Sequence, residues 1–228
     1  MITGKQLRDA VISGANSILK NRKYVDDLNI FPVPDGDTGT NMSMTIGAGS
    51  EAMEALGDGE TTAAVAKAAA SAMLRGARGN SGVILSLLFR GIAKSLKDRE
   101  TIDGRDLAIA LDFGVAAAYK AVMKPAEGTI LTVSRMAAAR AAGAAREDNC
   151  LESVLQAAIE EGQIALDNTI NQNPVLKKAG VVDAGGKGFL VILQGMLDEM
   201  RGVPMPQSEQ EEESAPAEKA DFAAMAAE

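Results

Sequence analysis

The sequence predicts an all-α fold, an antiparallel up-and-down bundle of eight helices. Aromatic residues make up only 3% of the 228 residues, Trp and His are absent, and alanine, leucine and methionine are abundant. This composition suits helices that pack through small side chains better than it suits a sheet. Apolar residues also recur at intervals of three and four along segments of helical length, and glycine- or proline-rich turns separate these segments.

The expected helices follow one another along the chain. The first covers residues 4–22 and ends before a proline-rich loop. Thr38 or Thr40 should cap the second, which runs to about residue 56. The other six are predicted at 61–75, from 79–82 to about 96, at 105–123, from about 129 to 145, at 151–170, and from 183 beyond 196.

Residues 1–202 are predicted to form one domain, and residues 203–228 a flexible acidic tail or linker. The segment 205–228 carries a net charge of −6, so the rest of the chain carries only about −2 of the total −8. No basic stripe or aromatic platform is visible, which argues against nucleic acid as a partner. Because no secretory signal and no apolar stretch of membrane-spanning length is visible, a cytoplasmic protein without a membrane span is expected.

The first motif with chemical content is the segment 28–42. Two prolines hold an extended backbone ahead of Asp35 and Asp37, whose alternate carboxylates can converge on a hard divalent cation. Asn29, just before the prolines, can add a carbonyl oxygen. The plainer alternative is an acidic turn followed by an ordinary N-cap. Thr38, Thr40 or Asn41 can cap the next helix, whose N-terminal amides would favour phosphate.

Two more turns precede apolar runs. Gly79, Asn80, Ser81 and Gly82 should form a helix N-terminus where an anion can bind, unless this is an ordinary loop with Ser81 as its N-cap. Thr129, near the start of the sixth helix, can face a ligand or bond back to its own helix.

The turn at 180–188 resembles a Walker A loop only superficially, because no Ser or Thr follows Lys187 and no strand precedes it. Asp183 is expected to cap the eighth helix, with Gly185 and Gly186 at its head, and a tight turn is the alternative. In an up-and-down bundle the loops before the second, fourth, sixth and eighth helices fall on one rim. This convergence favours a metal–nucleotide site.

Four segments, 29–42, 76–86, 121–132 and 180–188, closely resemble the N-terminal ATP-binding domain of bacterial fatty acid kinase. That domain is related to the nucleotide-binding subunit of dihydroxyacetone kinase. The resemblance spans roughly residues 1–202 and implies an eight-helix antiparallel barrel with the nucleotide at one rim. It also implies phosphoryl transfer from ATP to a fatty acid carboxylate, which a separate fatty-acid-binding carrier protein presents.

The same resemblance implies two Mg²⁺ ions held by Asp35, Asp37 and Asn29. Asn29 stands in for an aspartate of the dihydroxyacetone branch after a one-residue shift, and Thr38 stands where that branch usually has histidine. Both departures favour the fatty acid branch. The implied ATP site comprises Thr38, Thr40, Asn41, Gly79, Asn80, Ser81, Gly82, Thr129, Asp183, Ala184, Gly185 and Gly186.

Other readings stay open at this point. The chain can be a nucleotide-binding subunit of the dihydroxyacetone kinase type, an ATP-binding domain that transfers nothing without the rest of a longer chain, or a helical scaffold without a ligand. A homodimer is compatible with each of them. No residue is an obvious catalytic base, and an ionised carboxylate acceptor would not need one.

Overall fold

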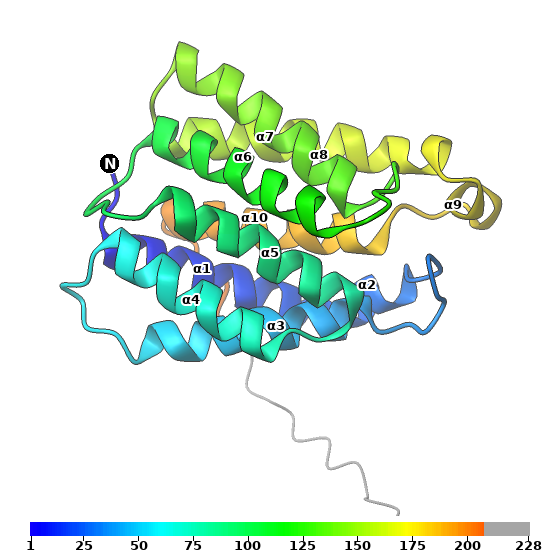
Figure 1. The fold of residues 1–228 in the computed structure, drawn as a ribbon, viewed down its shortest axis with the longest axis horizontal. Helices are drawn as coiled ribbons and strands as arrows, with labels where there is room; N and C mark the ends of the chain where they lie inside the picture. The colour runs from blue at the N-terminus through cyan, green and yellow to red at the C-terminus, as the bar shows by residue number, and fades with distance from the viewer. Residues whose placement is uncertain (208–228) are drawn as a thin grey trace, which may run out of the picture.

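The computed structural model describes residues 1–207 and confirms the all-α fold (Figure 1). Eight long helices occupy the predicted segments, with ends that differ from the expected ones by a few residues. In chain order they are α1 (Gly4–Lys20), α3 (Thr38–Glu54), α4 (Thr62–Gly76), α5 (Gly79–Ser95), α6 (Gly104–Ala121), α7 (Ile130–Glu147), α8 (Leu151–Gln172) and α10 (Ala184–Met200).

Two short helices, α2 (Arg22–Asp27) and α9 (Pro174–Ala179), were not predicted. The expected helix over 4–22 ends early because Asn21 caps α1, donating from its side chain to the carbonyl oxygen of Ser17 at 2.8 Å, and α2 begins at the next residue. Pro174 occupies the first position of α9, where a missing N–H costs nothing. Gly180, with φ of +70°, ends that helix.

The long helices alternate in direction, so their connections gather at two ends. In Figure 1 the loops that precede α3, α5, α7 and α10 lie at the right end of the bundle. The connections from α3 to α4, from α5 to α6 and from α7 to α8 lie at the left end. Helix α10 packs against α1, so the last helix closes the bundle beside the first.

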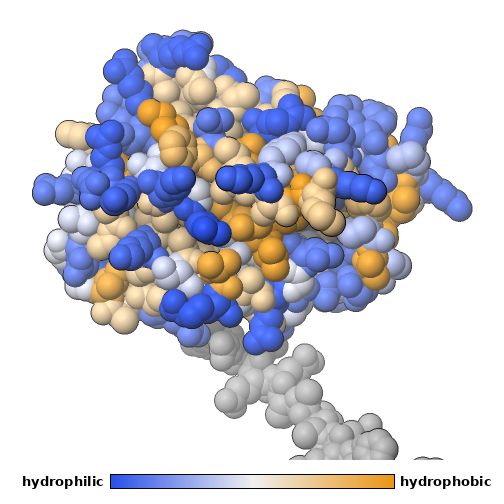
Figure 2. Space-filling model, viewed as in Figure 1, coloured by the Kyte–Doolittle hydropathy of each residue, from blue (hydrophilic) through white to orange (hydrophobic). Residues whose placement is uncertain are grey.

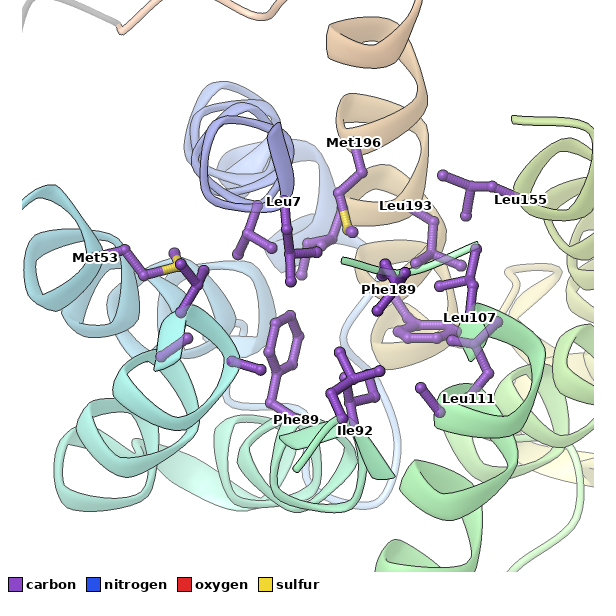
Figure 3. A pocket seen from close by; sticks show the side chains of 18 residues that line it. Leu7, Met53, Phe89, Ile92, Leu107, Leu111, Leu155, Phe189, Leu193 and Met196 are labelled. Carbon is purple, nitrogen blue, oxygen red and sulfur yellow. The ribbon is translucent and has the colours of Figure 1, made fainter. Parts of the chain in front are cut away.

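A cluster of buried apolar side chains forms the core, and helices approach one another closely where glycines face backbone. Gly91 of α5 and Gly114 of α6 lie at such a contact. An apolar cavity of about 50 Å³ lies on the bundle axis and is lined only by apolar side chains, among them Phe89, Phe189 and Met196 (Figure 3). Its lining comes from the starts of α1, α4, α6 and α8, the later turns of α3 and α5, and the middle of α10, so most of it belongs to the end opposite the four loops.

The chain beyond α10 stays in contact with the bundle for a few residues. The backbone N–H of Met205 donates to Ser13 Oγ at 3.0 Å, and its carbonyl oxygen accepts from Asn16 Nδ2 at 3.1 Å. The predicted flexible tail therefore begins with a segment tied to α1, and residues 208–228 lie outside the described residues.

The surface is mostly polar. Figure 2 shows apolar residues exposed near the middle of the face that α5 crosses, with charged side chains interrupting them. None of the helices in the described part of the chain is long and apolar enough to cross a membrane.

The glycine contact between α5 and α6 yields a matched pair of variants. A Cβ on Gly91 would overlap the backbone at Phe113 and Gly114, so Gly91→Ala should lower the unfolding free energy by about 1–3 kcal/mol through overpacking. A Cβ on Gly47, inside α3, would meet nothing within 4 Å. Gly47→Ala should therefore raise the unfolding free energy by about 0.5–1 kcal/mol. Urea denaturation measures both, and equal effects would contradict the close contact.

Candidate functional site

The turn before α3 carries the predicted acidic motif. Gly36, with φ of +66°, separates Asp35, which is exposed, from Asp37, which is half-buried. The side chain of Asn29 is buried beneath this turn, and its Oδ1 accepts hydrogen bonds from Asp37 N (3.2 Å), Thr38 N (3.1 Å) and Thr38 Oγ1 (2.6 Å). Its Nδ2 donates to Val33 O at 2.9 Å. Asn29 therefore supports the turn, and metal ligation would require it to give up some of these bonds.

Asp37 is the N-cap residue of α3, so the predicted caps Thr38 and Thr40 are wrong. Both threonines are already inside the helix because acceptors reach them from α2 and the following loop. The carboxylate of Asp26 accepts from Thr40 N at 2.9 Å and from Thr40 Oγ1 at 2.7 Å. The sequence offered no signal for Asp26, because the contact spans fourteen residues and depends on the unpredicted helix α2.

The start of α5 differs, because its amides are free. Arg78 is the N-cap residue and makes no side-chain cap, so the alternative of Ser81 as N-cap is wrong. Within the described residues, no acceptor lies within hydrogen-bonding distance of the backbone N–H groups of Gly79, Asn80 or Ser81. Gly79 and Asn80 are exposed and Ser81 is half-buried. The predicted helix N-terminus is therefore present and can accept an anion.

The starts of α3 and α5 are packed directly against each other. A Cβ on Gly79 would overlap the side chain of Asn41, and a Cβ on Gly82 would overlap Thr45 Oγ1. Thr45 also joins the two segments, since its Oγ1 accepts from Arg78 N at 3.1 Å and donates to Asn41 O at 2.7 Å. The first two turns of α3, which follow the acidic turn, are thus packed on the start of α5 that carries the free amides.

The starts of α7 and α10 form a second contact. Thr129 caps α7, with its Oγ1 accepting from Leu131 N at 3.3 Å and donating to Ala126 O at 2.8 Å. Its hydroxyl therefore bonds locally, which was one of the two alternatives. Cβ atoms on Gly185 and Gly186 would lie 3.3 Å and 2.8 Å from Ile130 and Val133 side chains respectively.

Asp183 caps α10 as predicted, accepting from Gly186 N at 2.7 Å. The side chain is only 5% exposed. Burial raises the pKa of Asp183 to about 6, and hydrogen bonds from the N–H groups of Gly186 and Ile130 oppose part of that rise. Ala184, Gly185 and Gly186 are buried as well. The structure gives these residues a packing role between α7 and α10, and a nucleotide contact stays a prediction.

Helix α10 brings the two halves of this rim together. Gly188 packs against Met42 of α3, where a Cβ would lie 2.6 Å from the sulfur. The ammonium of Lys187 lies 5.8 Å from the centre of the Tyr24 ring on α2. The four predicted motifs therefore gather at one end of the bundle, on the side where Figure 1 shows the loops before α3, α5, α7 and α10.

The donor set fits Mg²⁺. Within residues 1–207 neither Asp35 nor Asp37 has a hydrogen-bonding or ion-pair partner for its carboxylate, so both are available to a cation. No cluster of three or more acidic, Cys or His side chains suited to a metal exists in this described part. Mg²⁺ is usually held by one or two carboxylates, with water and phosphate completing its coordination, so two aspartates suffice.

Fold and site together define a class: an α-helical domain with a paired-carboxylate turn beside an uncapped helix start. The model of the DAK2 domain matches residues 32–198, and the chain belongs to the DAK2 domain family.

Curated relatives share nearly the whole described chain. An uncharacterized protein of Staphylococcus saprophyticus, SSP1546, is 48% identical over 202 residues, which are 88% of this chain and 36% of that protein. The YloV protein of Bacillus subtilis is 44% identical over 206 residues, 90% of this chain and 37% of that protein. The chain thus spans little more than a third of the length of these relatives.

A solved structure shares the fold. The dihydroxyacetone kinase of C. freundii, crystallised with AMP-PNP and Mg²⁺, matches 85% of this chain and 33% of its own, with a TM-score of 0.63 and 17% sequence identity. At this identity the likeness establishes the helical fold alone.

The buried carboxylate of Asp183 predicts a pH-dependent stability. Its pKa is about 6 in the folded protein against 3.8 for the ordinary side chain, so between these values the folded state binds the extra proton. As the pH rises from 4 to 6, wild type should lose up to about 3 kcal/mol of unfolding free energy relative to Asp183→Asn, which keeps a capping oxygen. Urea denaturation at several pH values measures the difference, and parallel pH profiles would contradict it.

Proposed function

We propose that this chain is the ATP- and magnesium-binding domain of a kinase that phosphorylates a fatty acid carboxylate. One observation carries the proposal: the turn with Asp35 and Asp37 leads directly into α3, and Asn41 and Thr45 of α3 pack against the start of α5, whose first three amides have no acceptor within residues 1–207. Carboxylates without partners suit a divalent cation, and free amides at a helix N-terminus suit phosphate. A magnesium nucleotide needs both features side by side.

In this proposal each part of the rim has its own role. Asp35 and Asp37 would hold Mg²⁺, with Asn29 either a third ligand or a support for the turn. The amides of Gly79 to Ser81 and the Ser81 hydroxyl would bind phosphate oxygens. Bound magnesium supplies neutralisation of the charge on the phosphates, as in other phosphoryl-transfer sites. Membership of the DAK2 family and the nucleotide in the C. freundii enzyme support this assignment.

The transfer itself needs little more than positioning. An oxygen of the acceptor carboxylate would attack the γ-phosphorus, the bond from that phosphorus to the bridging oxygen would break, and ADP would leave with the electron pair. The acceptor is already ionised, so no base is required. The helix start at α5 would keep the γ-phosphate in place and favour the charge on its oxygens.

The acceptor side of the reaction rests on parts outside this chain. Since the relatives are nearly three times as long, docking of a fatty-acid-binding carrier protein can depend on the remainder. The fatty acid as acceptor follows from the motif resemblance. A decisive assay incubates the full-length protein with ATP, Mg²⁺ and a lipid-loaded carrier, and detects acyl phosphate. Dihydroxyacetone phosphate formed from dihydroxyacetone instead would favour the other branch.

The first site prediction concerns the acidic turn. Asp37→Asn removes one carboxylate but no capping bond, because the Asp37 side chain makes none. Binding of Mg²⁺-ATP should weaken by about 1–3 kcal/mol, while helical content is unchanged. The matched control is Asp112→Asn on α6, an exposed aspartate that makes no ion pair within the described residues. Calorimetry with and without Mg²⁺ tests this, and equal affinities for the two variants would remove Asp37 from the site.

The second site prediction concerns the start of α5. Ser81→Ala removes a hydroxyl donor, and because Arg78 is the N-cap residue, helix stability should not change. Nucleotide affinity should fall by about 1 kcal/mol, the value of one hydrogen bond. Ser81 is a cleaner probe than Gly82, where any Cβ would push Thr45 away. An unchanged affinity for Mg²⁺-ATP would show that the hydroxyl does not reach phosphate.

A further inference from the structure

The carboxylate of Asp26 is the least expected group at the rim. It lies at the end of α2, is half-buried, and has no ion-pair partner among residues 1–207. Both of its oxygens are engaged with one residue: Oδ1 accepts from Thr40 N and Oδ2 from Thr40 Oγ1. An anionic side chain therefore occupies a place at the N-terminus of α3 that sequence alone would assign to phosphate.

The contact is part of a clamp between α2 and α3. Gly39 packs so closely on Arg22 that a Cβ would overlap the backbone there. Gly36 separates the two aspartates of the turn, and a Cβ built on it would lie 4.0 Å from the backbone oxygen of Asp26. Asn29 completes the clamp through its three hydrogen bonds to Asp37 and Thr38. Helix α2 and Asn29 thus hold both the turn and the first residues of α3 in place.

The clamp also makes the two neighbouring helix starts, those of α3 and α5, differ in how many backbone amides are free to bind an anion. At α3 the N–H groups of Asp37, Thr38 and Thr40 already have acceptors, and only that of the buried Gly39 has none within the described residues. At α5 the first three amides have none within the described residues. Since a helix start favours negative charge, the Asp26 carboxylate occupies part of the start of α3, and the start of α5 offers the longer run of free amides to an external anion.

We propose that Asp26 is a positioning residue of the site: through Thr40 it fixes the turn that carries Asp35 and Asp37, and it directs phosphate to the start of α5. The proposal rests on the function proposed above, but its first half concerns the protein without nucleotide. Asp26 touches neither metal nor phosphate in this role. Its effect on binding passes entirely through the geometry of residues 35–40.

The neighbouring aspartate provides a matched control. Asp27 is exposed and, within residues 1–207, pairs only with Lys23 on the surface, at 3.5 Å. Asp26→Asn and Asp27→Asn therefore change the net charge equally, one residue apart, but only the first alters the contact with Thr40. Thr40→Val removes the hydroxyl donor from the other side of the contact, and Thr40→Ser retains it.

Two measurements test the proposal. Calorimetry with Mg²⁺-ATP should show the dissociation constant raised about tenfold for Asp26→Asn and Thr40→Val, as expected when one charge-assisted hydrogen bond is lost, and unchanged for Asp27→Asn. Thr40→Ser, which keeps the hydroxyl, should bind more tightly than Thr40→Val. Without nucleotide, amide hydrogen exchange at residues 37–40 should be faster than in wild type for Asp26→Asn and Thr40→Val only. The Asp26→Asn/Thr40→Val double variant should bind no more weakly than either single one.

Several results would overturn the proposal. Wild-type affinity and exchange in Asp26→Asn would show that the turn is held without it. Tighter nucleotide binding in Asp26→Asn would mean that the carboxylate competes with phosphate at α3, and equal weakening in Asp27→Asn would indicate a general charge effect. If Asp26→Asn does not fold, the two Thr40 variants decide the same contact. If wild type fails to bind Mg²⁺-ATP, the proposed function fails, and the exchange rates alone decide whether Asp26 fixes the turn.

Discussion

The arrangement of this rim depends on how helix N-termini are satisfied. An antiparallel bundle brings four of them to one end, where unpaired amides and partial positive charges accumulate. At three of these four helix starts, side-chain oxygens accept hydrogen bonds from the N-terminal amides. Asn29 and Asp26 serve α3, Thr129 caps α7, and Asp183 caps α10. At α5 the N-cap residue is Arg78, which offers no acceptor. Helix α5 therefore differs from α3, α7 and α10 because no side-chain oxygen accepts a hydrogen bond from the amides of its first turn within the described residues.

This difference gives the rim its chemical asymmetry. The carboxylate of Asp183 is buried and engaged in capping, and that of Asp26 is engaged with Thr40. Within residues 1–207, Asp35 and Asp37 have carboxylates without partners, and they precede the helix that packs on the free amides of α5. The turn before α3 can thus bind a cation and the start of α5 can bind an anion, while the apolar cavity on the axis belongs to the other end of the bundle. A polyanion with its cation can use the first region, and only apolar groups suit the second.

Periodicity and composition predicted the eight long helices, their order and the shared rim, because burial of one face imposes a repeat that is visible in the sequence. The short helix α2 has no such repeat, and it was missed. Two errors followed from that omission: the caps assigned to Thr38 and Thr40, and the silence about Asp26. Asp183 was predicted correctly because a cap precedes its own helix in sequence. A cap supplied from another helix is invisible without the tertiary structure.

The contact of Gly79 and Gly82 with Asn41 and Thr45 has an evolutionary consequence. A Cβ at either glycine would displace the side chain of Asn41 or Thr45, Gly79 has a positive φ of +59°, and Thr45 Oγ1 also accepts from the amide of Arg78. Substitutions on the two helices must therefore be compensated jointly, and the four positions are expected to covary through descent as a single unit. Residues on the outer face of each helix can be substituted independently, whereas a substitution at one of these two helix starts requires a compensating substitution at the other.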